Sequence, residues 1–364
     1  MRSILVTGGA GFIGSHLVDE LLEHGYDVRV LDSLIGQVHG AVERPAYLSR
    51  AAELQVGDVR DAQAVRKALE GVDAVVHLAA RVGVGQSMYE ITEYTGANSF
   101  GTAVLLQALL DRPVQKLVVA SSMSIYGEGA TAPVEATERT RDDLEARRFE
   151  PRGAGGETLT PLPTPETKRP ANTSVYALTK YDQERLCLVF GEAYAVPTVA
   201  LRFFNVYGPR QALSNPYTGV LAIFASRLLN ERPPLVFEDG GQRRDFVNVA
   251  DVVRACRLAL ERDDADGRAV NIGSGESVTV TEIAEQLARV LEVDIAPEVT
   301  GRFRAGDILH CFADIALARD LLGYRPAVAL ADGIAELADW LETQSADDRV
   351  DHATSELLSR GLAR

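Results

Sequence analysis

Short apolar runs alternate along the chain with longer stretches in which apolar residues recur at helical spacing. The runs at 3–7, 74–80 and 116–120 are rich in Val, Leu and Ala, which is typical of strands buried on both faces. Stretches such as 15–24 and 98–110 place apolar residues three and four positions apart, as amphipathic helices do. This alternation predicts a parallel sheet covered by helices on both faces, the doubly wound α/β architecture.

The first 32 residues combine a strand, a glycine-rich turn, a helix and a second strand that ends in Asp32. Glycines allow a tight turn and let a pyrophosphate approach the first amides of the helix, whose free N–H groups and dipole favour negative charge. Asp32 can bind the ribose hydroxyls of an adenosine and would repel a 2′-phosphate, so NAD is favoured over NADP. This order of elements predicts a Rossmann-type dinucleotide site. Its expected contacts are Gly8, Gly11, Phe12, Ile13, Gly14 and Asp32.

Three later strand ends extend the predicted site. The first runs into Asp58 and Val59, where the edge of an adenine would be met. The second ends in Leu78-Ala79-Ala80, small residues that leave space for the cofactor. The third continues into the polar segment 121–127, and doubly wound sheets bind their ligands at such strand ends.

The second half of the chain is less regular. We expect 246–249 and the helix over 251–261 to return to the edge of the sheet, and Val270 to Ile272 to lie in a second lobe. Residues 134–172 carry many charges, glycines and prolines, which indicates either an ordered excursion over the site or a disordered loop. The predicted domains are 1–205 with 245–262 for the dinucleotide, 206–244 with 263–344 as a smaller α/β substrate lobe, and 345–364 as a frayed polar tail.

Composition narrows the classes of partner. A net charge of −15 argues against nucleic acid or an anionic membrane surface, and an anionic substrate would need a local group of arginines. The three cysteines lack metal-ligand spacing, so we expect buried thiols and no metal. No apolar run approaches the roughly 20 residues of a membrane span, and the first strand leaves no room for a signal peptide, which favours the cytoplasm.

Tyr176 and Lys180 are four residues apart on a predicted helix and share one of its faces. A nearby ammonium lowers the pKa of a phenol, so the pair can take a hydroxyl proton while a nicotinamide takes the hydride from the same carbon. Ser122 or Ser121 at the end of a strand can hold the substrate oxygen. The spacing is common on ordinary helices, but after a dinucleotide motif it indicates a dehydrogenase-like centre.

With these motifs in place, the chain resembles the extended short-chain dehydrogenase/reductase family, in particular its nucleotide-sugar epimerases and dehydratases. The resemblance covers residues 1 to about 340 and also rests on 202–209, 243–247 and 304–307. It implies a catalytic Ser122, Tyr176 and Lys180, and further cofactor contacts from Asn98, Tyr176 and Lys180, the last holding the nicotinamide ribose. Arg185 and 215–224 are expected to touch sugar or base. The substrate contacts it implies are Val84, Ser122, Ser124, Tyr176, Asn205, Arg244 and Arg304.

The resemblance also separates the possible reactions. Sugar 4,6-dehydratases of the family carry Asp-Glu where this chain has Met123 and Ser124, and the Glu of related decarboxylases is missing as well. We therefore expect an NAD-dependent 4-epimerase of a dTDP- or UDP-hexose, with tightly bound NAD regenerated in each cycle. A dehydratase or decarboxylase is the alternative within this class, and a non-catalytic NAD-sensing or scaffold protein is the alternative outside it. Relatives commonly form homodimers through the helices near 98–110 and 176–194.

Overall fold

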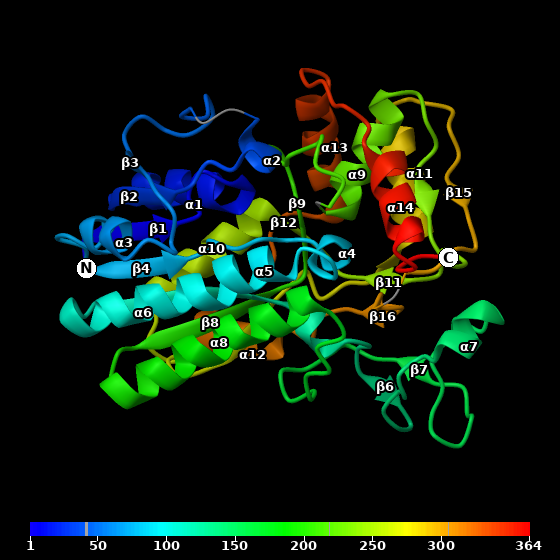
Figure 1. The fold of residues 1–364 in the computed structure, drawn as a ribbon, viewed down its shortest axis with the longest axis horizontal. Helices are drawn as coiled ribbons and strands as arrows, with labels where there is room; N and C mark the ends of the chain where they lie inside the picture. The colour runs from blue at the N-terminus through cyan, green and yellow to red at the C-terminus, as the bar shows by residue number, and fades with distance from the viewer. Residues whose placement is uncertain (41–42, 218, 305) are drawn as a thin grey trace.

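A seven-stranded parallel sheet forms the centre of the computed structural model, which describes residues 1–40, 43–217, 219–304 and 306–364 (Figure 1). The strand order is β13-β8-β5-β4-β1-β2-β3, so the sheet is doubly wound, as predicted. The strands are β1 (Ser3–Thr7), β2 (Asp27–Asp32), β3 (Glu53–Val56), β4 (Ala74–His77), β5 (Lys116–Ser122), β8 (Thr198–Phe203) and β13 (Ala269–Ile272).

Helices cover both faces of the sheet because each has one apolar side. One face packs against α1 (Phe12–Glu23), α10 (Val249–Glu261) and α12 (Ala316–Leu322), and the other against α3 (Ala62–Ala68), α6 (Gly101–Asp111) and α8 (Val175–Tyr194). Each face has its own apolar core, and all three cysteines are buried, as predicted. No helix in the described part of the chain is long and apolar enough to cross a lipid bilayer.

A smaller lobe lies beside the carboxyl ends of the strands (Figure 1). Its core joins α9 (Val220–Leu229), α11 (Val280–Val290) and α13 (Leu330–Leu341). Small sheets border it: β9 (Asn205–Tyr207) with β12 (Phe246–Asn248), β10 (Leu235–Val236) with β15 (Glu298–Val299), and β14 (Val278–Thr279), β11 (Arg243–Arg244) and β16 (His310–Cys311). Short helices follow two strands of the central sheet: α2 (Gly36–His39) follows β2, and α4 (Val84–Ser87) and α5 (Ile91–Tyr94), with a π-helix at Thr95–Phe100, follow β4.

The sheet edge differs from the prediction. The stretch at 246–249 pairs with β9 outside the central sheet, and the edge strand is β13, which we had assigned to the second lobe. The crossover through α10 carries the chain back beside β8, where Val270 and Ile272 are fully buried. A strand this short has the same sequence pattern whether it belongs to the central sheet or to a small peripheral one. Its pairing partner is set by the path of the crossover helix before it.

The C-terminal segment is not a frayed tail. It forms α14 (Val350–Ser359), whose Val350, Ala353, Thr354 and Leu357 are buried against the rest of the protein. The polar composition of 345–364 concealed an apolar stripe on one face of this helix.

The excursion at 134–172 is ordered, but none of its residues lines the main cavity. It carries β7 (Thr160–Pro161), which pairs with β6 (Thr131–Ala132), and α7 (Arg141–Glu145), and it lies near β16 (Figure 1). Buried Arg139 explains the order, because it pairs with Glu238 at 2.7 Å and Glu128 at 3.1 Å. The excursion therefore supports the second lobe instead of lying over the site.

Candidate active site

A cavity of about 600 Å³ lies where the carboxyl ends of the central strands meet the second lobe. It brings together residues from Gly8 to Leu362, which are 354 positions apart in the chain. Of the predicted site residues, Asn98 and Arg185 do not line it, whereas the following do: Gly8, Gly11, Phe12, Ile13, Gly14, Asp32, Asp58, Val59, Leu78, Ala79, Ala80, Val84, Ser122, Ser124, Tyr176, Lys180, Asn205, Arg244 and Arg304.

The glycine turn brings the backbone unusually close to itself. A Cβ on Gly14 would lie 2.2 Å from the Gly8 carbonyl oxygen, so no side chain fits there. Gly11 caps α1 without a side-chain hydrogen bond, and Phe12 and Ile13 of the first turn face the cavity. The free amides and the helix dipole suit the pyrophosphate of a dinucleotide.

Two carboxylates mark the adenosine end of the cavity. Asp32 accepts the backbone N–H groups of Ala10 at 3.0 Å and Leu34 at 2.9 Å, which fixes its side chain. Burial raises the pKa of Asp58, but hydrogen bonds and charge from Arg60 outweigh it and leave the pKa below its usual value. Asp58 is therefore an anion at neutral pH, and Asp32 is held in the orientation that a ribose diol requires.

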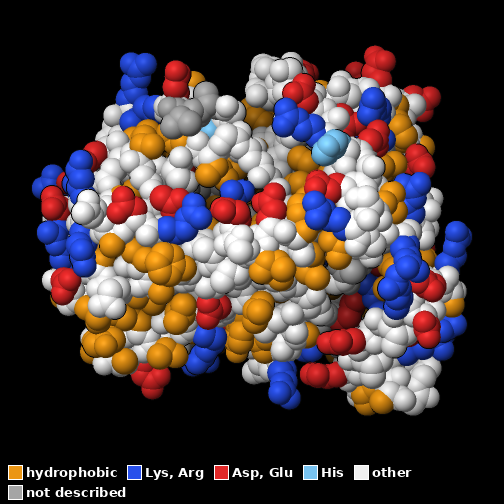
Figure 2. All heavy atoms as spheres, viewed as in Figure 1, with side chains coloured by type: hydrophobic (Ala, Val, Ile, Leu, Met, Phe, Trp, Pro, Cys, Tyr) orange, Lys and Arg blue, Asp and Glu red, His pale blue; other side chains and the backbone are white. Residues whose placement is uncertain are grey.

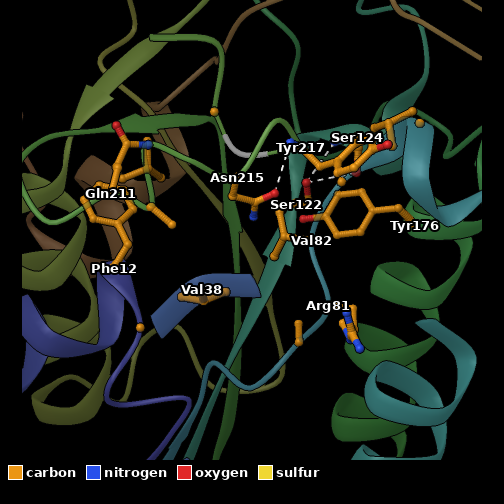
Figure 3. A pocket seen from close by; sticks show the side chains of 18 of the residues that line it. Phe12, Val38, Arg81, Val82, Ser122, Ser124, Tyr176, Gln211, Asn215 and Tyr217 are labelled. Atoms are coloured by element: carbon orange, nitrogen blue, oxygen red, sulfur yellow. Dashed lines mark hydrogen bonds between the residues drawn. The ribbon is translucent and has the colours of Figure 1, made fainter. Parts of the chain in front are cut away.

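Three hydroxyl groups meet at the centre of the cavity. Ser174 caps α8 and the Tyr176 amide donates to Ser87 Oγ at 3.0 Å, which together fix the start of this helix. The Tyr176 phenol points toward Ser122, whose Oγ accepts the Ser124 hydroxyl at 2.9 Å (Figure 3). Burial raises the pKa of Tyr176 above its usual value near 10, and Ser122 partly opposes that change. A phenol that is protonated at neutral pH needs a nearby positive charge to act as a base.

Lys180 lies one turn along α8 and is buried, and burial lowers its pKa to about 8. Its Nζ donates to Gln183 Oε1 at 2.7 Å, an interaction that the sequence did not suggest. Gln183 Nε2 in turn donates to Thr102 Oγ1 at 2.9 Å, and the Thr102 hydroxyl lies 2.9 Å from His77 Nε2. Burial and the nearby Lys180 lower the pKa of His77 to about 3, so it is neutral. A chain of uncharged polar groups thus supports the Lys180 ammonium.

The opposite end of the cavity carries the predicted arginines. Arg304 binds Asp307 through two hydrogen bonds of 3.0 and 2.8 Å and stacks over Phe237 at 4.4 Å. Arg244 lies 4.0 Å from the same carboxylate. Burial raises the pKa of Asp307, but the two arginines outweigh it and hold the pKa below its usual value. Two guanidinium groups that share one carboxylate retain net positive charge, which suits a diphosphate.

Several buried polar atoms of the described lining are unsatisfied, and one of them belongs to a predicted substrate contact. The Oδ1 of Asn205, which lines the cavity, has no hydrogen-bond partner among the described residues. Buried amide oxygens are normally bonded, so an unsatisfied one in a cavity is an acceptor that a ligand can use.

Two predicted contacts lie elsewhere. Asn98 is fully buried beneath the cavity, where its amide binds the backbone of Arg81 and donates to Thr179 Oγ1 at 3.0 Å. Arg185 is exposed on α8 and is not part of the lining. Asn98 therefore shapes the loop that follows β4 instead of facing a ligand.

Sequence reasoning missed the contribution of the C-terminal segment. The lining includes five residues from this segment, in addition to residues from 211–217 and 219–224. A signal was present, because four of them follow the i, i+3, i+4, i+7 spacing of a buried helix face. The five residues are Val350, Ala353, Thr354, Leu357 and Leu362.

The site and fold place the protein in a known family. Residues 4–152 and 152–273 match the model of the NAD dependent epimerase/dehydratase family, and the chain belongs to that family. It is 37% identical to dTDP-L-rhamnose 4-epimerase of Burkholderia thailandensis over 350 residues, 93% of this chain and 95% of that protein.

Solved structures agree with that assignment. UDP-glucose 4-epimerase of Thermotoga maritima, determined with UDP-glucose, superposes with a TM-score of 0.78 at 32% identity, covering 94% of this chain and 99% of that chain. The enzyme of the same name from Thermus thermophilus, determined with NAD, gives 0.75 at 32% identity with the same coverage. The predictions of fold, family, NAD as cofactor and nucleotide-sugar 4-epimerisation as the class of reaction are confirmed.

Proposed function

We propose that the protein interconverts the C4 epimers of a dTDP-activated 6-deoxyhexose, with a UDP-hexose as the second candidate substrate. One observation carries the choice of reaction: hydroxyl groups surround the reacting position, and no described carboxylate lies among them. The carboxylates in the described lining are Asp32 and Asp58 at the adenosine end and Asp307, which is paired with arginine. Elimination of water would need an acid and a base beside Ser122, where Met123 and Ser124 stand.

The roles of the central residues follow from their positions. Tyr176 takes the proton of the C4 hydroxyl, and Ser122 holds the C4 oxygen through its own hydroxyl. Below pH 8 Lys180 is an ammonium that stabilises the Tyr176 phenolate. NAD held by the glycine turn and Asp32 would supply a hydride acceptor for C4 and, in the return step, a hydride donor to the other face of the ketone. Rotation of the sugar between these two steps is what inverts C4.

The glycine turn, α1 and Asp32 would hold the NAD. The close approach at Gly14 and the uncapped start of α1 support this assignment, since both suit a pyrophosphate. Arg244 and Arg304 would bind the diphosphate of the substrate, and Asn205 would accept a hydrogen bond from it or from its sugar.

The choice of sugar rests on similarity and is open to a direct test. Purified protein would be incubated with dTDP-L-rhamnose, UDP-glucose, UDP-glucuronate and dTDP-glucose while NMR follows the H4 couplings. We expect interconversion of axial and equatorial H4 signals, fastest with dTDP-L-rhamnose. A 4-keto-6-deoxy product would contradict the proposal, and unchanged spectra with all four sugars would favour the NAD-sensing alternative.

We also propose a homodimer formed through α6 and α8. Hydrophobic side chains gather over these helices (Figure 2), and Phe100, Leu178 and Val189 are each more than half exposed. Replacing Leu178 and Val189 together with Asp should give a monomer in light scattering after gel filtration. Val299→Asp, on the second lobe and 49% exposed, is the matched control. A monomeric parent protein would refute the dimer.

We also propose that the protein is located in the cytoplasm. Three unpaired, buried cysteines suit a reducing compartment. Fractionation of expressing cells, with the protein recovered only in a membrane or secreted fraction, would contradict it.

A further inference from the structure

The C-terminal segment 345–364 forms a wall of the substrate cavity. Its lining residues present one hydroxyl, from Thr354, and otherwise only apolar groups. In Figure 1 α14 lies in front of β11 and beside α9, between the viewer and the second lobe. A substrate that binds in this half of the cavity therefore faces α14.

This wall is held at three places, so its position is defined. Near its start, Arg227 Nη1 donates to Asp351 at 2.8 Å. At the end of α14, the guanidinium of Arg360 stacks over the ring of Tyr89 at 4.4 Å from the centroid. After the helix, the backbone of Phe303 exchanges hydrogen bonds of 2.8 and 3.0 Å with that of residue 364. These contacts come from three different parts of the second lobe and its connections.

Leu357 joins this wall to α4. A Cβ built on Gly85 would lie 3.4 Å from both terminal carbons of Leu357, so the leucine packs directly on α4. The same helix carries Val84, which lines the cavity, and Ser87, whose Oγ accepts the Tyr176 amide. Leu357 is thus one short helix away from the residue assigned as the base.

Charge is absent from this part of the described lining. Its cations are Arg60, Arg81 and Lys180 toward the cofactor and Arg244 and Arg304 toward the diphosphate. Neither α4 nor α14 contributes a lysine or an arginine to it. A carboxylate buried against these two helices would lack a partner, whereas a methyl group would lose nothing by leaving water.

We propose that Leu357, together with Val84 of α4, determines the class of sugar by forming an apolar, uncharged pocket for the C6 substituent. The pocket accepts the methyl group of a 6-deoxyhexose, tolerates a hydroxymethyl group and rejects the carboxylate of a uronic acid. This inference rests on the proposed function, because it assumes that a nucleotide sugar occupies the cavity with C4 beside Tyr176.

Binding measurements test it without relying on turnover. NAD-loaded full-length protein would be titrated calorimetrically with dTDP-L-rhamnose, UDP-glucose and UDP-glucuronate; the last two differ only at C6. We expect Leu357→Ala to weaken binding of dTDP-L-rhamnose at least fivefold. Leu357→Arg should shift the ratio of affinities for UDP-glucuronate and UDP-glucose at least tenfold toward the uronate. Leu358→Ala, the neighbouring and 39% exposed leucine, should change neither.

The outcomes separate the two proposals. If both Leu357 variants leave the ratio within twofold of the parent, or weaken all three sugars equally, the specificity role is wrong. If Leu357→Arg does not fold by circular dichroism, Thr354→Lys places a cation one turn away on the same face and takes over the test. A parent that discriminates between the sugars as expected but epimerises none would refute the proposed function and leave the pocket supported.

Discussion

The two halves of the cavity are built in different ways. The cofactor half is formed mainly by backbone: the glycine turn and the start of α1 lie within one continuous segment, Gly8 to Gly14. The substrate half is formed by side chains from separate segments, among them Asn205, Arg304 and Leu357. Ion pairs and stacking hold these side chains together, such as Arg304 with Asp307.

This difference has a physical consequence for specificity. A backbone site depends on local conformation, so most substitutions around it leave its chemistry unchanged and only those that alter the turn destroy it. A side-chain site can change its ligand by single substitutions while the fold persists. If the two halves are independent, a substitution in one of them leaves ligand binding by the other unchanged.

The largest effect is expected where the halves meet. Tyr176→Phe removes the proposed base and should lower kcat by about 10²–10⁴-fold, measured by the NMR assay with the preferred sugar. NAD content, read from absorbance after denaturation, should equal that of the parent, because the phenol is not needed to hold the dinucleotide. Tyr194→Phe, at the exposed end of the same helix, is the control. A fully active Phe variant would exclude Tyr176 as the base.

The next effect should be confined to the cofactor half. Gly14→Ala would bring a methyl group to 2.2 Å from the Gly8 carbonyl oxygen and 2.6 Å from the Gly9 Cα, so the turn must open. We expect NAD affinity to fall by about two orders of magnitude, since the backbone cradle would lose its shape. Gly36→Ala, at a position with nothing within 4 Å, should bind NAD normally. Equal NAD binding by both variants would contradict the backbone interpretation.

The same contrast explains what the sequence could predict. Gly8 to Gly14, Asp32 and the Tyr176–Lys180 pair are local patterns, and their positions in the structure agree with what those patterns require. Local patterns reflect backbone conformations that do not depend on the path of the rest of the chain. The fold class and the location of the cavity therefore follow from the first half of the chain.

The features that the sequence did not predict depend on contacts between distant parts of the chain. The partner of β13 depends on a crossover, and the position of the excursion depends on the buried ion pairs of Arg139. Leu357 had a visible helical pattern, yet no pattern states which surface that helix covers. Lys180 and Gln183 are three residues apart, a spacing that allows contact on a helix. The same spacing occurs between solvent-exposed residues, so the sequence did not predict this buried interaction.

A smaller effect should be confined to the substrate half. Arg304→Ala removes a charged donor from the proposed diphosphate site, and hydrogen bonds to charged groups contribute about 1.5–3 kcal/mol. We therefore expect KM for the nucleotide sugar to rise about 10- to 100-fold, with kcat and NAD content little changed. Arg302→Ala, two residues earlier and exposed, is the matched control. Loss of NAD from Arg304→Ala would show that the two halves are not separable.

The smallest expected effect is the change in the free energy of unfolding on acidification, which has opposite signs for one buried group in each half. In the cofactor half, the pKa of His77 is about 3 in the folded protein and near 6.5 when unfolded, so the unfolded state binds the extra proton and acidification destabilises the fold. Near Arg244, burial raises the pKa of Asp245 to about 6 although Ser274, Gly275 and Ala313 donate to it. Here the folded state binds the extra proton, so the same acidification stabilises the fold.

Each contribution changes the free energy of unfolding by about 1 kcal/mol between pH 7 and 5.5, and in the parent protein the two nearly cancel. Urea unfolding at both pH values separates them. His77→Asn should leave the Asp245 contribution alone and make the protein relatively more stable at pH 5.5, whereas Asp245→Asn should make it relatively less stable. Each variant is the other's control, because any general loss of stability cancels in the difference between the two pH values. If both variants kept the pH dependence of the parent, neither group would titrate as its burial requires, and the contrast between the halves would not extend to their buried charges.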